Sequence, residues 1–221
     1  MIKVVLFDLD DTLISENEYV KSGYHYVARI IANKYLMNDK EVYKKLYLLY
    51  KQSTKNVFNR LLDQDNIKYT KEDILFLVNE YRNHIPAIHF YDDVIPVLDI
   101  LKQKKIRIGI ISDGYLSTQY RKAKVLNLYN VFDKVIFTEE LGPKYWKPHP
   151  KAFEIMKKYF NVEYQEILYI GDNPQKDFYI KSIYPIKTVR IMRKSNLYKD
   201  ELYYKGIIED QRISNLKEIL I

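Results

Sequence analysis

Asp8 and Asp10, within Asp8-Leu9-Asp10-Asp11-Thr12, follow directly on an apolar run at the start of the chain. Alternation along an extended strand end predicts that both side chains point to the same side. Two neighbouring carboxylates repel each other and need a counter-charge, and a divalent cation with hard oxygen ligands, such as Mg²⁺, suits them. Taken alone, the segment also fits aspartates of an ordinary loop or helix cap.

Two further segments could bind an anion. Ser112-Asp113-Gly114 ends a second apolar run and offers a hydroxyl and exposed backbone amides as donors, although the same triplet also forms ordinary turns. Lys147 lies in Trp146-Lys147-Pro148-His149-Pro150, where the prolines fix the backbone. Its ammonium group could neutralise a phosphate, and the alternative is a solvated surface lysine.

A fourth segment adds two carboxylates. Gly171 permits a tight turn after another apolar run, Asp172 stands at the end of that run, and Asp177 is expected near the first turn of a following helix. Each segment is ambiguous alone, but each follows a predicted strand. Ligands bind at the carboxyl ends of parallel strands, so we expect all four segments at one edge of a sheet.

Short apolar runs without alternation are typical of strands buried on both faces of a parallel sheet. Helical patterns separate these runs from about residue 90 onward, and the alternation indicates an α/β, doubly wound (Rossmann-like) parallel sheet. The predicted strands are residues 2–9, 106–111, 134–137, 167–170 and 187–191, the last at a sheet edge. The predicted helices between them are 93–104, 115–127, 150–160 and 175–183.

Residues 15–88 interrupt this rhythm and read as consecutive helices, at about 16–36, 39–51, 54–65 and 70–84. Ser15 with Glu18, and Thr70 with Asp73, have the spacing of capping boxes. We therefore expect an inserted helical domain, with residues 1–14 and 89–221 forming the α/β core.

Composition excludes several classes of protein. The 221 residues contain no cysteine, which excludes disulfide scaffolds, thiolate zinc sites and cysteine nucleophiles. No apolar run approaches the roughly 20 residues of a membrane span, and the start lacks the features of a signal peptide. The 36 basic and 29 acidic residues are dispersed, which argues against a nucleic-acid partner. We expect a cytoplasmic protein, monomeric or homodimeric.

The four segments together resemble the ordered motifs of the haloacid dehalogenase-like (HAD) hydrolase superfamily, over nearly the whole chain. The insert resembles the C1 cap of its phosphoglycolate-phosphatase and β-phosphoglucomutase branch. Two departures from the family pattern are His149 between the prolines and the lack of Gly-Ala pairs after Asp177. The matching residues are Asp8, Asp10, Thr12, Ser112, Lys147, Gly171, Asp172 and Asp177.

The resemblance implies a role for each catalytic residue. Asp8 would be the nucleophile that forms an aspartyl-phosphate, and Asp10 the general acid–base, which requires its neighbours to raise its pKa. Lys147 would stabilise the charge of the phosphate and of Asp8.

The remaining roles concern the phosphate and the metal. Ser112, with the neighbouring Asp113 and Gly114, would hold the phosphoryl oxygens. Mg²⁺ would be bound by Asp8, by the backbone carbonyl of Asp10 and by Asp172. Asp177, Gly171 and Thr12 would support the site.

The implied function is a Mg²⁺-dependent phosphatase of a small phosphorylated metabolite. A phosphomutase of the β-phosphoglucomutase type shares every core motif and stays an alternative. A dehalogenase is disfavoured because that branch lacks the acid–base carboxylate that Asp10 provides here. A phosphonatase is disfavoured because it needs a Schiff-base lysine in the cap, and none stands out. A non-catalytic binding protein on this fold is the remaining option.

Overall fold

The computed structural model describes residues 1–194 and 202–219. They divide into two compact units, Met1–Glu16 with His89–Ile221, and Asn17–Ile88. The first boundary lies two residues later than expected from the sequence, after Glu16 instead of after Ile14. Among the described residues, none of the helices has the length and apolar character that a membrane span needs.

The larger unit is built on a parallel sheet of six strands in the order β3-β2-β1-β4-β5-β6. The strands are β1 (Val4–Phe7), β2 (Arg107–Ser112), β3 (Lys134–Phe137), β4 (Ile167–Gly171), β5 (Lys187–Ile191) and β6 (Gln211–Ile213). The α/β doubly wound fold expected from the alternating pattern is confirmed.

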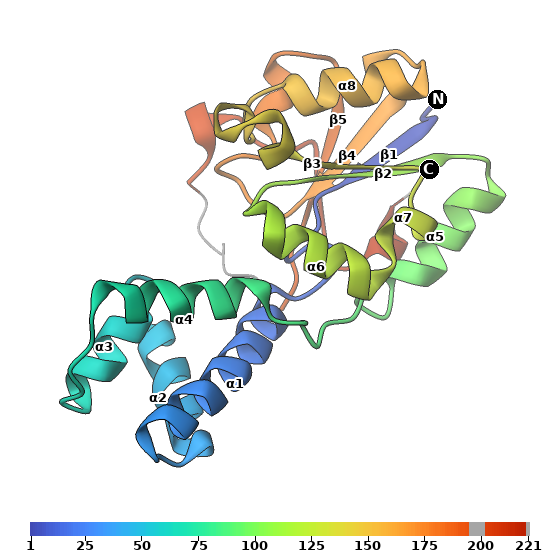
Figure 1. Ribbon diagram of the computed structural model, residues 1–221. Helices are drawn as coiled ribbons and strands as arrows, with labels where there is room; N and C mark the ends of the chain where they lie inside the picture. The colour runs from blue at the N-terminus through green and yellow to red at the C-terminus, as the bar shows by residue number, and fades with distance from the viewer. Residues whose placement is uncertain (195–201, 220–221) are drawn as a thin grey trace. The chain divides into compact units, whose positions relative to one another are not determined.

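Helices cover both faces of this sheet (Figure 1). They are α5 (Val94–Gln103), α6 (Leu116–Leu126), α7 (Leu128–Val131) and α8 (Lys151–Phe160). Side chains alternate along β1, so Val4 and Leu6 join the cluster that includes Phe153 and Met156 of α8. Every residue of β1 is buried, as expected for an inner parallel strand that is covered on both faces.

Two predictions for the end of the sheet are wrong. β5 does not lie at the edge, because β6 pairs with it in parallel. No α-helix spans residues 175–183, and only a short 3₁₀ turn forms, at Tyr179–Ser182. The side chain of Asn173 accepts a hydrogen bond from the Gln175 N–H, and that of Asp177 accepts one from the Asn173 N–H, so turns replace the helix.

The smaller unit consists of α1 (Glu16–Tyr35, whose first residue belongs to the larger unit), α2 (Asp39–Gln52), α3 (Val57–Gln64) and α4 (Lys71–Asn83). Apolar and aromatic side chains of all four helices form its own core. The capping box predicted for Thr70 and Asp73 is present at the start of α4. The helix expected from residue 54 begins later, at Val57, after Asn56 in the left-handed conformation.

Candidate active site

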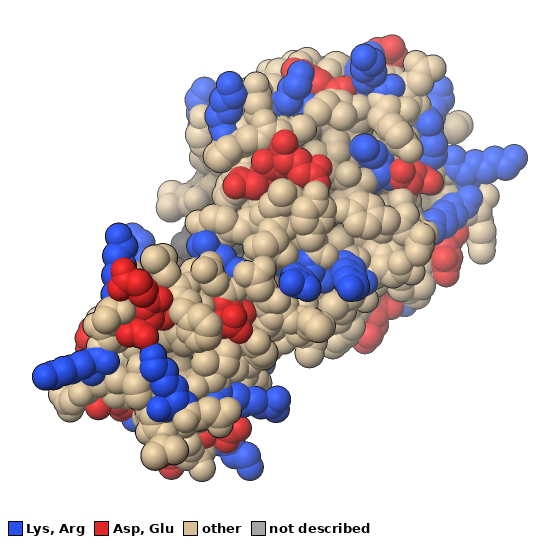
Figure 2. Space-filling view, in the orientation of Figure 1, with Lys and Arg blue, Asp and Glu red and all other residues tan. Residues whose placement is uncertain are grey.

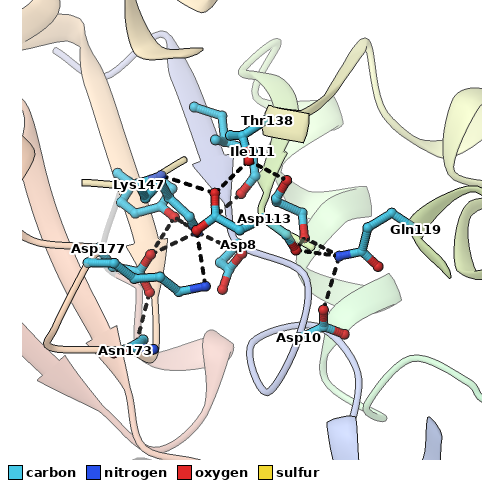
Figure 3. A network of polar contacts seen from close by, with 12 residues as sticks. Asp8, Asp10, Ile111, Asp113, Gln119, Thr138, Lys147, Asn173 and Asp177 are labelled. Carbon is cyan, nitrogen blue, oxygen red and sulfur yellow. Dashed lines mark hydrogen bonds and ion pairs between the residues drawn. The ribbon is translucent and has the colours of Figure 1, made fainter. Parts of the chain in front are cut away.

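Asp8 is the first residue after β1, and its backbone N–H continues the sheet by donating to the carbonyl of Ile170 (2.8 Å). Its buried carboxylate lies 2.8 Å from the Lys147 ammonium (Figure 3). Burial raises the pKa of Asp8 to about 6, although Lys147 and Lys176 counteract this effect. The carboxylate is therefore poorly compensated and open to a further cation.

Lys147 is buried and is surrounded by oxygen atoms. Its ammonium contacts Asp8, Asp177 (2.8 Å) and the Tyr169 hydroxyl (2.8 Å). Burial alone would lower the pKa of Lys147, but the carboxylates of Asp177, Asp8 and Asp113 outweigh it and raise the pKa. The lysine thus keeps a fixed positive charge in the interior.

The carboxylates of Asp8, Asp172 and Asp177 lie within 4.8 Å of one another, all buried. Oδ2 of Asp172 is buried without a hydrogen-bond partner. Burial and the charges of Asp177 and Asp8 raise the pKa of Asp172 well above its usual range. These oxygen donors suit a divalent cation such as Mg²⁺.

The charge count agrees with such a cation. Four carboxylates gather here, and two ammonium groups face them, those of Lys147 and Lys176. With all four carboxylates ionised, four negative and two positive charges leave a net charge of −2, which one divalent cation would neutralise. The carboxylates are those of Asp8, Asp113, Asp172 and Asp177.

Ser112 and Asp113 follow the line of β2 to the same edge. The Asp113 carboxylate accepts from the Thr138 hydroxyl (2.7 Å) and the Lys147 N–H (3.1 Å), and it pairs with Lys176 (3.3 Å). Burial opposes its ionisation, but Lys147 and Lys176 hold the pKa of Asp113 below its usual range. A negative carboxylate repels phosphate, so only the backbone N–H of Asp113 could bind one.

Gly114 and Gly171 each occupy a place that a side chain would disturb. Gly114 has a φ of 133°, in the region that favours glycine. A Cβ on Gly171 would lie 2.4 Å from the Asp177 carboxylate. Thr12 is buried, and its carbonyl accepts from the Arg193 guanidinium (2.9 Å), which ties this loop to the core.

The carboxylate of Asp10 is not a member of the cluster around Asp8. Its oxygens contact Lys122 (2.6 Å) and Gln119 (3.1 Å), both from α6. Burial raises the pKa of Asp10, but Lys122, Glu16 and Gln119 outweigh this and lower it. The raised pKa that we expected for Asp10 is thus wrong for this arrangement, because a buried ammonium lies beside it.

Sequence reasoning missed several residues around the site. A signal was available for two of them, because Gln119 and Lys122 occupy the same helical face as the buried Ala123 and Leu126. A lysine at a core-facing position indicates a buried partner. For the others nothing in the spacing pointed to the site. They are Glu16, Thr138, Tyr169 and Lys176.

Comparisons with known proteins place the chain among hydrolases. A family model described as haloacid dehalogenase-like hydrolase matches residues 5–181. A glyceraldehyde 3-phosphate phosphatase of Methanocaldococcus jannaschii is 30% identical, over 100% of this chain and 96% of the relative. A glyceraldehyde 3-phosphate phosphatase of Pyrococcus abyssi is 31% identical, over 86% of this chain and 81% of the relative.

Among solved structures, the HAD-hydrolase YfnB of Bacillus subtilis, described as bound to magnesium, has a TM-score of 0.67. It is 18% identical, and the match covers 98% of this chain and 96% of that one. At this identity the likeness concerns the fold.

Proposed function

The chain belongs to the haloacid dehalogenase-like hydrolase family, and we propose that it is a phosphatase that hydrolyses a small phosphorylated metabolite with Mg²⁺ as its cofactor. The observation that carries this proposal is the contact of Asp8 with Lys147 beside two further buried carboxylates. It supplies a nucleophile, a fixed cation for the phosphoryl group and oxygen ligands for a metal.

In the first step, an Asp8 oxygen attacks phosphorus and the bond from phosphorus to the ester oxygen breaks. The leaving oxygen takes a proton from Asp10. In the second step, water attacks the phosphorus of the aspartyl-phosphate and passes a proton to Asp10. The bond between phosphorus and Asp8 then breaks, and phosphate leaves.

Asp10 needs a proton for the first step and a free carboxylate for the second. Lys122 favours the ionised form, which is the form that accepts a proton from water. A dianionic ester beside Asp10 acts in the opposite direction, because like charges favour the neutral acid.

The phosphoryl oxygens need positive charge and donors. Lys147, the Ser112 hydroxyl and the backbone N–H groups of Asp113 and Gly114 would supply them. Asp8, Asp172 and the Asp10 backbone carbonyl would hold Mg²⁺, which supplies further positive charge to the phosphoryl group when bound. Asp177 would orient this arrangement through Lys147 and Tyr169.

The substrate class follows from the relatives named above, which are glyceraldehyde 3-phosphate phosphatases. A triose phosphate is therefore the first compound to test.

We propose no nucleic-acid or membrane partner. On the face drawn in Figure 2, Lys and Arg lie among Asp and Glu, which fits this view. A cytoplasmic monomer or homodimer remains our proposal.

The test is a panel of triose phosphates, other sugar phosphates, phosphoglycolate and p-nitrophenyl phosphate, with and without Mg²⁺. We expect Mg²⁺-dependent release of inorganic phosphate, loss of turnover in Asp8→Asn, and normal turnover in the exposed control Asp92→Asn. Retention of phosphate in an isomeric product would favour the phosphomutase. No turnover on any ester would favour a binding protein, and an active Asp8→Asn would contradict the assignment.

A further inference from the structure

We infer that Gln119 and Lys122 of α6 are positioning residues that hold the Asp10 carboxylate beside the phosphoryl-binding residues. This inference rests on the proposed acid–base role of Asp10. It assigns the two side chains to the reaction and not only to the packing of the helix.

Gln119 and Lys122 are both buried, which is unusual for an amide and an ammonium group. Gln119 is 0% exposed and Lys122 is 2% exposed, at positions three apart on the face of α6 that also carries Ala123 and Leu126. Apolar residues at such positions would pack without the cost of desolvating an amide and an ammonium. The two polar side chains therefore cost stability, which indicates that their contacts serve another purpose.

Those contacts converge on Asp10, 112 residues away from Lys122 in the sequence. Lys122 binds Oδ1 at 2.6 Å, and Gln119 binds Oδ2 at 3.1 Å. With a separate donor on each oxygen, both the position and the plane of the carboxylate are set. One donor alone would leave the carboxylate free to turn about its side-chain bond.

The ammonium of Lys122 is itself held in place. It also contacts the Glu16 carboxylate at 2.8 Å, so two acceptors from the segment that follows β1, Asp10 and Glu16, fix it. An ammonium on a long flexible stem could otherwise follow Asp10 instead of restraining it.

Gln119 links Asp10 to the second motif. Its amide nitrogen also lies 2.8 Å from the Ser112 hydroxyl and 2.8 Å from the Asp113 carbonyl (Figure 3). One nitrogen thus faces three acceptors, while the amide oxygen is buried without a partner. The amide therefore sets the separation between the acid–base residue and a residue proposed to hold the phosphate.

A positioning role predicts an effect that depends on the leaving group. Asp10 protonates the leaving oxygen, and an alkyl alcohol needs this proton far more than p-nitrophenol does. General acid–base catalysis contributes about 10²–10⁴-fold, and misplacement of a reacting group costs up to about 10²-fold. A purely structural role would lower activity on both kinds of ester to the same extent.

The experiment measures kcat/KM for glycerol 2-phosphate and p-nitrophenyl phosphate, because this constant covers the steps up to departure of the alcohol. For Lys122→Met and Gln119→Leu we expect a fall of about 10- to 100-fold on the alkyl ester and less than about 3-fold on the aryl ester. Lys124→Met, on the exposed face of the same helix, should match the wild type on both.

A double-mutant cycle with Asp10→Asn completes the test. If Lys122 acts through Asp10, the double variant Asp10→Asn/Lys122→Met is no slower on the alkyl ester than Asp10→Asn alone. Equal losses on both esters, or multiplicative losses in the cycle, overturn the inference. Should Lys122→Met fail to fold by circular dichroism, Gln119→Leu and the cycle of Gln119→Leu with Asp10→Asn decide the question.

Failure of the proposed function looks different. An active Asp8→Asn, or an Asp10→Asn variant with unchanged kcat/KM on the alkyl ester, would remove the premise. Loss of turnover in Asp8→Asn and a lowered kcat/KM of Asp10→Asn on the alkyl ester would support the proposed function. If Lys122→Met then matches Lys124→Met, only the positioning role is rejected.

Discussion

The close approach of Gly171 and Asp177 yields a quantitative prediction for Gly171→Ala. The added Cβ would lie 2.4 Å from Oδ2 and 2.6 Å from Cγ of Asp177, about 1 Å short of an ordinary contact. The carboxylate cannot move away without disturbing its own contacts. It is buried and held by Lys147 (2.8 Å), by the Tyr169 hydroxyl (3.0 Å) and by the Asn173 N–H (2.9 Å).

The magnitude follows from the contacts that must give way. Overpacking costs about 1–3 kcal/mol, and loss of one hydrogen bond to a charged group costs about 1.5–3 kcal/mol. Alanine also lowers the conformational entropy of the unfolded chain, which stabilises the folded protein by about 0.4–1 kcal/mol. We expect a loss of about 2–5 kcal/mol in the free energy of unfolding, measured by urea denaturation. Displacement of Asp177 moves Lys147 with it, so kcat should fall about 10²-fold.

Gly206→Ala is the control, because a Cβ there would meet nothing within 4 Å although φ is 70°. It should cost only the left-handed backbone penalty of about 1–2 kcal/mol and leave kcat unchanged. If Gly171→Ala proves no less stable than Gly206→Ala and equally active, the steric reasoning is wrong.

Two further predictions concern the buried carboxylates. At about 100 times its Kd, Mg²⁺ should stabilise the wild type by about 2.7 kcal/mol, a rise in Tm of about 5–10 °C in a thermal melt. Asp172→Asn should lose most of that rise in Tm. Without metal, the variant should be more stable than the wild type, because it removes a buried charge whose Oδ2 lacks a partner. An undiminished rise would exclude Asp172 as a ligand. The second prediction is pH-dependent. The folded-state pKa of Asp8 is raised from 3.8 to about 6, so its contribution to stability is present below pH 4 and is lost as the pH rises to 6. In metal-free protein, Asp8→Asn should therefore gain up to about 3 kcal/mol on the wild type between these pH values in urea melts, and a constant difference would contradict the assigned shift.

Strand positions and motif positions could be predicted from the sequence, for a local reason. A strand buried on both faces needs a short run of apolar residues, and Val4–Phe7 and Ile167–Gly171 provide such runs. Parallel strands then bring their carboxyl ends to one edge. The meeting of Asp8 and Asp172 is a consequence of that geometry.

Other features depended on interactions that no local pattern reveals. β6 has only three residues, and it forms because β5 offers it a pairing edge. Residues 175–183 have a helical apolar spacing, but Asp177 is held by Tyr169 and Lys147 and its carboxylate accepts from Asn173, so turns form instead.

The sequence was sufficient to propose Asp8 as the nucleophile, Lys147 as the fixed cation and Asp8 and Asp172 as metal ligands, because their residue types and order resemble the motifs of the family. The environment of Asp10 required the folded chain. α6 brings Gln119 and Lys122 to a carboxylate more than 100 residues distant. Burial alone would raise the pKa of Asp10, and these neighbours make it fall instead. Spacing along the chain determines which side chains reach the edge of the sheet, whereas the balance between desolvation and neighbouring charge depends on every element that packs there.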